Sequence, residues 1–237
     1  FAQLDYVDLA AWKRWIDYPL DLESGKGALR VWMRTDGERV TNFDADLALA
    51  DVRARLGSDL PLLDLEYLRG RLGGSRGAVA GARRLVQAYG RQMTLKTVRG
   101  KLVPPTDFSL RVEELATGVG DRGELSVSVL AFEPLADLLD YLPAPLQVRT
   151  RLAQFAPLGK ASEFKLSWTG SLDTPTSFSL RSRFSGLDIK IPDGWGAYKG
   201  LSGEVTASKT GGNLRIDSVN ASIELPDMLV ERVARFD

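Results

Sequence analysis

Residues 28–49 read ALRVWMRTDGERVTNFDADLAL, and this stretch decides the fold class. Every second side chain is apolar across Leu29–Met33 and again across Phe43–Leu49, and the turn-forming run Thr35–Gly37 lies between them. Successive side chains of a strand point to opposite faces of a sheet, so this alternation places the apolar ones on one face. The stretch therefore predicts two antiparallel strands of a hairpin with one apolar face and one wet face.

The same alternation recurs along the rest of the chain and defines one set of apolar positions. They are Leu29, Val31, Met33, Phe43, Leu47, Leu49, Leu63, Leu65, Phe108, Leu110, Val112, Leu125, Val127, Val129, Phe164, Leu166, Phe178, Leu180, Phe184, Leu214 and Ile216. Glycine or proline is expected to break the strands at five places. These places are Gly73–Gly74, Pro104–Pro105, Gly118–Gly123, Pro175 and Gly211–Gly212.

Helical spacing occurs at only a few places. The leucines of Leu135–Leu142 follow an i, i+3, i+4, i+7 pattern between two prolines, which predicts a short helix. A second helix is expected between Pro145 and Pro157, and a third around Leu9–Ile16. The sequence therefore predicts a mostly β fold with a few short helices.

The composition removes several classes of chemistry. The 237 residues include 31 Lys and Arg, 31 Asp and Glu, and neither His nor Cys, so the formal net charge is zero. Without His or Cys there is no Ser-His-Asp or Cys-His nucleophile and no thiolate or imidazole metal site. A neutral chain gives no reason to expect a nucleic-acid partner. We expect no enzymatic activity, no metal and no cofactor.

The chain also contains two similar halves. A Gly precedes a strand with Trp32 in the first half and one with Trp168 in the second, and the motif around Gly70 resembles the motif around Gly203. The order of these features favours tandem units of a helix followed by antiparallel strands, the first at residues 1–131 and the second, truncated, at 132–237. Chance similarity between alternating segments is the alternative.

Several stretches resemble the central part of the YhdP family, large AsmA-like envelope proteins of Gram-negative bacteria related to TamB. The stretches are Gly25–Trp32, Ala45–Val52, Tyr67–Gly74, Pro134–Pro143, Lys165–Trp168, Phe184–Leu187 and Gly200–Val205. The resemblance covers nearly the whole chain, but its motifs are structural ones built on glycine, proline and apolar residues, and they carry no active-site signature. The resemblance therefore implies an architecture and a cellular role, without a set of functional residues.

The resemblance implies a curved, twisted β-sheet groove in the periplasm, anchored in the inner membrane by a segment outside this sequence. A chain that begins with Phe1 and has no signal peptide is expected to be such a fragment. The implied role is movement of phospholipids between the inner and outer membranes, with the apolar positions above lining the groove for acyl chains. Burial of the same positions in a non-conducting structural or assembly module of the envelope is the alternative. Open edge strands would let the fragment self-associate.

Three groups of polar or aromatic residues have two interpretations each. The arginines could hold a lipid phosphate or form a solvated surface; they are Arg53, Arg55, Arg69, Arg71, Arg76, Arg83 and Arg84. Trp32 and Trp168 could be packing anchors or lipid contacts, although their strand parities differ and a β-bulge would be needed to reconcile them. Asp44 and Asp46 share a strand face and are interpreted as solvated rather than catalytic.

Overall fold

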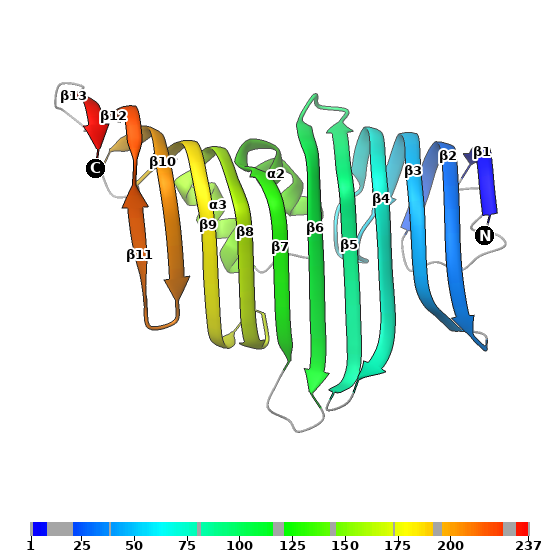
Figure 1. Ribbon diagram of the computed structural model, residues 1–237. Helices are drawn as coiled ribbons and strands as arrows, with labels where there is room; N and C mark the ends of the chain where they lie inside the picture. The colour runs from blue at the N-terminus through cyan, green and yellow to red at the C-terminus, as the bar shows by residue number, and fades with distance from the viewer. Residues whose placement is uncertain are drawn as a thin grey trace.

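The computed structural model describes residues 2–8, 21–37, 39–79, 82–115, 121–142, 146–172, 174–191, 196–224 and 231–236. Within these ranges thirteen strands form a single sheet (Figure 1). The strands are β1 Ala2–Asp8, β2 Asp21–Asp36, β3 Arg39–Arg55, β4 Leu63–Val79, β5 Ala82–Thr97, β6 Leu102–Leu115, β7 Arg122–Ala131, β8 Leu158–Gly170, β9 Pro175–Lys190, β10 Ala197–Ser208, β11 Gly211–Ile216, β12 Ser218–Glu224 and β13 Glu231–Phe236. The predicted mostly β fold is confirmed.

The sheet is an antiparallel meander in which strands lie side by side in chain order from β1 to β10. Beyond β10 the path divides, because β11 pairs with Gly203–Ser208 and β12 pairs with Ala197–Lys199. The strand β13 then pairs with β12 at the end of the sheet. Pairing continues without interruption from β7 to β8, across the boundary predicted between the two units. The division into residues 1–131 and 132–237 stays a prediction.

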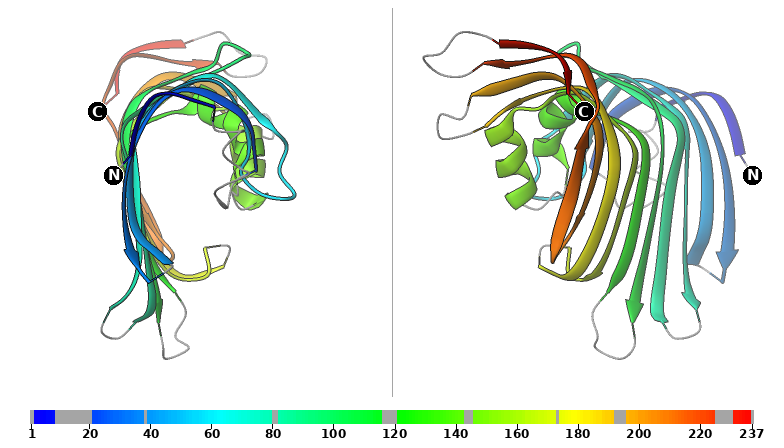
Figure 2. Two further views of the ribbon diagram at one scale, coloured as in Figure 1. Left: turned by 90° about the vertical axis from the view of Figure 1, so that its right-hand side faces the viewer. Right: turned by 60° about the vertical axis from the view of Figure 1, so that its left-hand side comes forward.

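Figure 2 shows that the sheet curves along its strands and bends over at one end. The helix α2 (Phe132–Leu138), the 3₁₀ turn η1 (Leu139–Tyr141) and the helix α3 (Leu146–Phe155) connect β7 to β8 and lie inside this bend. We call the side of the sheet that carries these helices the inner face and the opposite side the outer face. The curved sheet therefore has a concave inner face that the helices cover only in part.

The principal hydrophobic cluster lies where α2 meets the inner face. Leu138 is a buried member of the same cluster as Leu29, Leu49 and Leu65 of the first strands of the sheet. These three strand residues belong to the predicted apolar set, and their alternation brings them to one face. The helix α2 lies nearest to β6, β7 and β8, and the apolar cluster that contains Leu138 extends from there to β2–β4.

Both helices predicted between prolines are present, and the first ends in the 3₁₀ turn η1 before Pro143. The helix expected around Leu9–Ile16 lies outside the described residues. None of the helices among the described residues is both long enough and apolar enough to cross a membrane.

Two of the predicted strand breaks are wrong. Gly73 and Gly74 lie inside β4, where the Tyr89 ring occupies the space beside Gly73 and the Phe43 ring the space beside Gly74. Their missing side chains make room for neighbours and do not end the strand. Residues 104–105, both proline, lie inside β6 at an irregularity in its pairing with β5, the kind of position at which a strand tolerates residues without an N–H group.

Pro175 begins β9 and Gly211 begins β11, so two other predicted breaks coincide with strand ends. The break predicted at Gly118–Gly123 lies partly outside the described residues, and its last glycine is within β7. Most strands are much longer than the alternating runs that predicted them.

Candidate functional site

The pairing register places one continuous row of apolar or small side chains across ten strands of the inner face. We call these residues the central row: Met33, Phe43, Gly74, Ala88, Leu110, Leu125, Leu166, Leu180, Ala207 and Gly212. Directly paired residues of antiparallel strands project to the same face, so no polar side chain interrupts this row. Neighbouring strands lie about 4.8 Å apart, which makes the row roughly 43 Å long.

A second apolar row lies beside the central row, toward the bend. Its members are Val31, Ala45, Leu72, Gly90, Phe108, Val127 and Phe164. A third row lies on the other side of the central row, away from the bend, and we call it the lower row: Arg76, Val86, Val112, Gly123, Trp168 and Phe178. The inner face is therefore apolar over three adjacent rows, with Arg76 as the one charged member of these rows.

The predicted groove-lining residues differ in how deeply they are buried. Five are buried: Leu29, Leu49, Leu63, Leu65 and Phe184. Thirteen are half-buried: Val31, Leu47, Phe108, Leu110, Val112, Leu125, Val127, Val129, Phe164, Leu166, Phe178, Leu180 and Ile216. Three are exposed: Phe43 at 37%, Met33 at 56% and Leu214 at 60%.

This distribution follows the position of the helices. Four of the five buried residues belong to the cluster under α2, and Phe184 packs in a second cluster with Leu201 and Ala221. The central row keeps partial access to solvent, since none of its leucines reaches full burial. The structure thus brings the predicted set to one face, where one part is a closed core and another is an open apolar surface. Whether lipid lines this surface stays a prediction.

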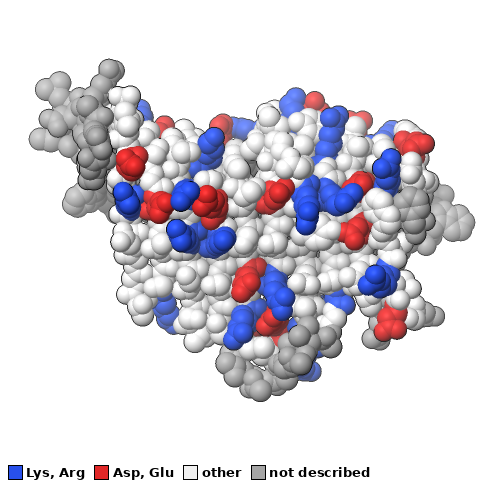
Figure 3. All heavy atoms as spheres, in the orientation of Figure 1, with Lys and Arg blue, Asp and Glu red and all other residues white. Residues whose placement is uncertain are grey.

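The outer face along the same strands is polar. The row paired next to the central row on this face contains Trp32, Asp44, Gly73, Tyr89, Ser109, Ser126, Lys165, Arg181, Thr206 and Asn213. Figure 3 shows Lys, Arg, Asp and Glu side chains of both signs spread over this side of the molecule. The two faces of one sheet therefore differ sharply in polarity, as the alternation predicts.

Ion pairs join neighbouring strands on the outer face at corresponding positions of the two halves. Arg71 Nε donates to Asp46 Oδ1 at 2.6 Å across β3 and β4. Arg183 Nε donates to Glu204 Oε1 at 2.8 Å across β9 and β10, and its Nη1 reaches Glu163 Oε1 at 3.0 Å. In the second half the cation Arg183 thus lies between two acids. In the first half the acid Asp46 lies between two cations, Arg71 on β4 and Arg30, its directly paired residue on β2.

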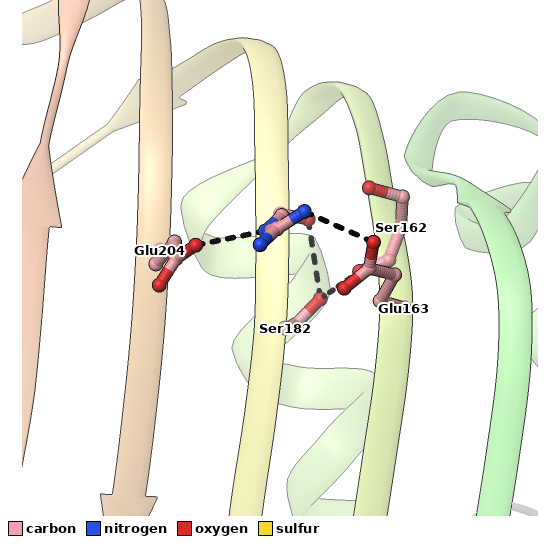
Figure 4. A network of polar contacts seen from close by, with 5 residues as sticks. Ser162, Glu163, Ser182 and Glu204 are labelled. Atoms are coloured by element: carbon pink, nitrogen blue, oxygen red, sulfur yellow. Dashed lines mark hydrogen bonds and ion pairs between the residues drawn. The ribbon is translucent and has the colours of Figure 1, made fainter.

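Figure 4 shows Glu163 and Glu204 on the strands that flank β9. The hydrogen bond from Arg71 lowers the pKa of Asp46 below its ordinary value, and the hydrogen bond from Arg183 lowers the pKa of Glu204 in the same way. The paired side chains are 32–52% exposed, so each pair contributes little to stability. These ion pairs connect neighbouring strands, and their geometry indicates a structural role.

The two aspartates singled out by sequence are both engaged by partners. Asp44 accepts a hydrogen bond from the Tyr89 hydroxyl, and Asp46 is held by Arg71. Among the described residues, no group of three or more acidic side chains is placed to hold a metal ion.

The two tryptophans lie on opposite faces of the sheet. Trp168 is 6% exposed on the inner face, whereas Trp32 is 36% exposed on the outer face with the Arg71 guanidinium 5.6 Å from its ring centre. They are therefore not equivalent packing anchors, and the parity difference in the sequence is a real difference in direction. The two halves of the chain diverge at this position.

The arginine group divides into engaged and unengaged members. Arg53 pairs with Asp64 and Glu23, Arg71 pairs with Asp46, and Arg69 lies over the Tyr67 ring. Arg55 is half-buried at the end of β3. Within the described residues, the remaining three have no hydrogen bond, ion pair or ring contact: Arg76, Arg83 and Arg84.

Sequence reasoning missed the small members of the apolar rows. The strand β5 was not among the predicted runs, although it contributes Val86, Ala88 and Gly90 to three adjacent rows. Alternation with Gln87, Tyr89 and Arg91 was the available signal, but Ala and Gly are weak evidence for an apolar face. Their small size leaves room for the rings of neighbouring residues. The Phe108 ring, for example, occupies the space beside Gly90.

A comparison with protein-family models gives a match. The family model described as YhdP protein matches residues 1–236, which is nearly the entire chain. Searches of curated proteins and of solved structures gave no match.

Proposed function

Because this chain belongs to the YhdP family, we propose that its inner face carries phospholipid acyl chains between the inner and outer membranes. Family membership supports an AsmA-like envelope protein. The proposal places the chain in the periplasm, as a segment of a lipid-transport scaffold anchored in the inner membrane by a segment outside this sequence. It assigns the chain no catalytic step.

The central row is the observation that carries this proposal. A methylene group exposed to water costs about 0.8 kcal/mol, so a lipid with two long chains does not leave a membrane readily. A continuous apolar strip lowers this cost at every point along the path. The row is roughly 43 Å long, compared with about 15 Å for one leaflet of a typical hydrocarbon core, so acyl chains can lie along it end to end.

The polarity of the outer face also supports this proposal. Its ion pairs and serines keep the sheet hydrated, so the apolar rows stay confined to the concave side. Continuous apolar surfaces of this extent are rare on soluble monomers unless they bind something. A curved sheet with one wet and one apolar face suits an amphipathic ligand whose head group remains in water.

The second candidate is a non-conducting structural or assembly module of the envelope. The cluster under α2 favours it, because Leu138 closes part of the inner face as an ordinary core. The two candidates differ in what occupies the remaining rows. Lipid occupies them in the first, and protein contacts outside the described residues cover them in the second.

Native mass spectrometry of the chain, purified from a bacterial envelope, tests the proposal. Co-purifying phospholipid is expected in the parent protein and absent from the double variant Leu110→Asp/Leu180→Asp, which charges two positions of the central row. The control is Ser109→Asp/Ser179→Asp, one residue away on the outer face, where both serines are exposed. A folded, lipid-free parent protein would favour the structural module. So would lipid that survives in the Leu110→Asp/Leu180→Asp variant.

A further inference from the structure

The margin of the inner face farthest from the bend carries two arginines without partners. Arg76 of β4 and Arg84 of β5 are exposed, and neither has a hydrogen bond, ion pair or ring contact within the described residues. On the outer face, by contrast, Arg53, Arg71 and Arg183 are each paired with acids. The unpaired guanidinium groups are therefore free to bind a ligand.

The register places both arginines on the apolar side of the sheet. Arg76 pairs directly with Val86 and is the first member of the lower row. Arg84 lies two residues before Val86 on the same strand, so its side chain projects to the same face. The two are diagonal neighbours across β4 and β5, which sets the residues about 7–8 Å apart and their β-carbons somewhat closer. Their long side chains can converge on one group between them.

One acid stands beside this pair. Glu114 of β6 is directly opposite Arg84, although within the described part of the chain no ion pair joins them. Two guanidinium groups and one carboxylate leave a single net positive charge at this margin. A phosphodiester carries a single negative charge, and its oxygens match the forked N–H donors of arginine. The charge and the geometry suit a phospholipid head group beside an apolar surface.

We propose that Arg76 and Arg84 hold the phosphate of a phospholipid whose acyl chains lie on the lower and central rows. This site rests on the proposed function, since it needs acyl chains on the inner face. It adds a fixed orientation to that function. The phosphate stays at the margin farthest from the bend, and the chains extend from Val86 and Val112 toward Leu110.

Two lipids with the same acyl chains, one with a phosphate and one without, distinguish phosphate binding by the arginines from acyl-chain binding by the apolar rows. Binding of dioleoyl phosphatidylglycerol and of dioleoylglycerol, which lacks the phosphate, is measured by native mass spectrometry in detergent. The parent protein is expected to bind the phospholipid about fivefold more tightly, as charge-assisted contacts at an exposed site allow. The variant Arg76→Gln/Arg84→Gln is expected to bind both lipids equally and as tightly as the parent binds dioleoylglycerol.

The control is Arg181→Gln/Arg99→Gln, which removes the same charge. Arg181 belongs to the outer-face row of β9, and Arg99 lies in the β5–β6 turn; both are exposed. The control is expected to keep the fivefold preference. Equal binding of both lipids by the parent protein, or a preference that survives in Arg76→Gln/Arg84→Gln, would overturn the head-group site and leave acyl binding standing. Failure of the parent to bind either lipid would overturn the proposed function itself.

Discussion

Trp168 of β8 lies directly opposite Gly123 of β7, and its indole occupies the space that a side chain on Gly123 would need. The indole is 6% exposed. Both residues belong to the lower row, so the large indole of Trp168 packs beside a neighbour that has no side chain. The absence of a side chain on Gly123 gives the Trp168 indole room to pack on the inner face.

A methyl group at position 123 is therefore expected to displace the indole. Gly123→Ala should destabilise the protein by about 1–3 kcal/mol, as overpacking does in well-packed sites. Tryptophan emission should also shift toward the red as Trp168 becomes more exposed. Urea denaturation and fluorescence measure the two effects.

Gly77→Ala is the matched control for this substitution. Gly77 is also a strand glycine, but nothing lies within 4 Å of the β-carbon that the substitution adds. Its free energy of unfolding and its emission should stay close to those of the parent protein. Equal effects of the two substitutions would show that the indole does not lie against Gly123.

The position of α2 depends on Leu138. This side chain is 7% exposed in the cluster with Leu29 and Leu49. Leu138→Ala should lower the free energy of unfolding by about 2–5 kcal/mol through lost burial and a residual cavity. Leu146→Ala, in the neighbouring helix α3, should have little effect because Leu146 is 76% exposed. Chemical denaturation of both variants compares them, and a silent Leu138→Ala would mean that α2 does not close the bend.

Acid should weaken the ion pairs of the outer face. The hydrogen bond from Arg71 lowers the pKa of Asp46 in the folded protein relative to the unfolded chain. The stabilisation is therefore complete above the unfolded-state pKa and is lost as the pH falls through the folded-state pKa. The difference in stability between the parent protein and Asp46→Asn should be small at neutral pH and should vanish in acid.

Urea denaturation across a pH series measures this difference. Glu204→Gln should behave in the same way, because Arg183 lowers the pKa of Glu204. A difference between parent and variant that stays constant down to the most acidic pH at which the protein folds would contradict the ion-pair interpretation.

The sequence predicted which side chains of a single strand share a face better than it predicted how the strands pair with one another. Alternation identified Leu110 and Leu180 as members of one apolar set, and the register places both in the central row. The helix between prolines at Leu135–Leu142 also appears where its spacing predicts it. Local periodicity is sufficient for these features because it depends on neighbours in sequence alone.

Long-range contacts explain what the sequence did not reveal. Residues with positive φ, such as Asp51 and Glu163, interrupt the alternation, so parity cannot be carried along a whole strand. In the sequence, Gly73 and Gly74 resemble a strand break. In the structure, the rings of Tyr89 and Phe43 occupy the space beside these glycines within β4. The unpaired state of Arg76 likewise depends on which strands lie beside it.

Site-specific photocrosslinking in living cells tests the central claim most directly. A photoreactive amino acid at Leu110 should capture phospholipid, whereas the same amino acid at Ser109, one residue away on the outer face, should not. The account predicts a lipid adduct at Leu110 that mass spectrometry identifies by its acyl chains. Equal labelling at both positions, or labelling of protein alone at Leu110, would contradict it.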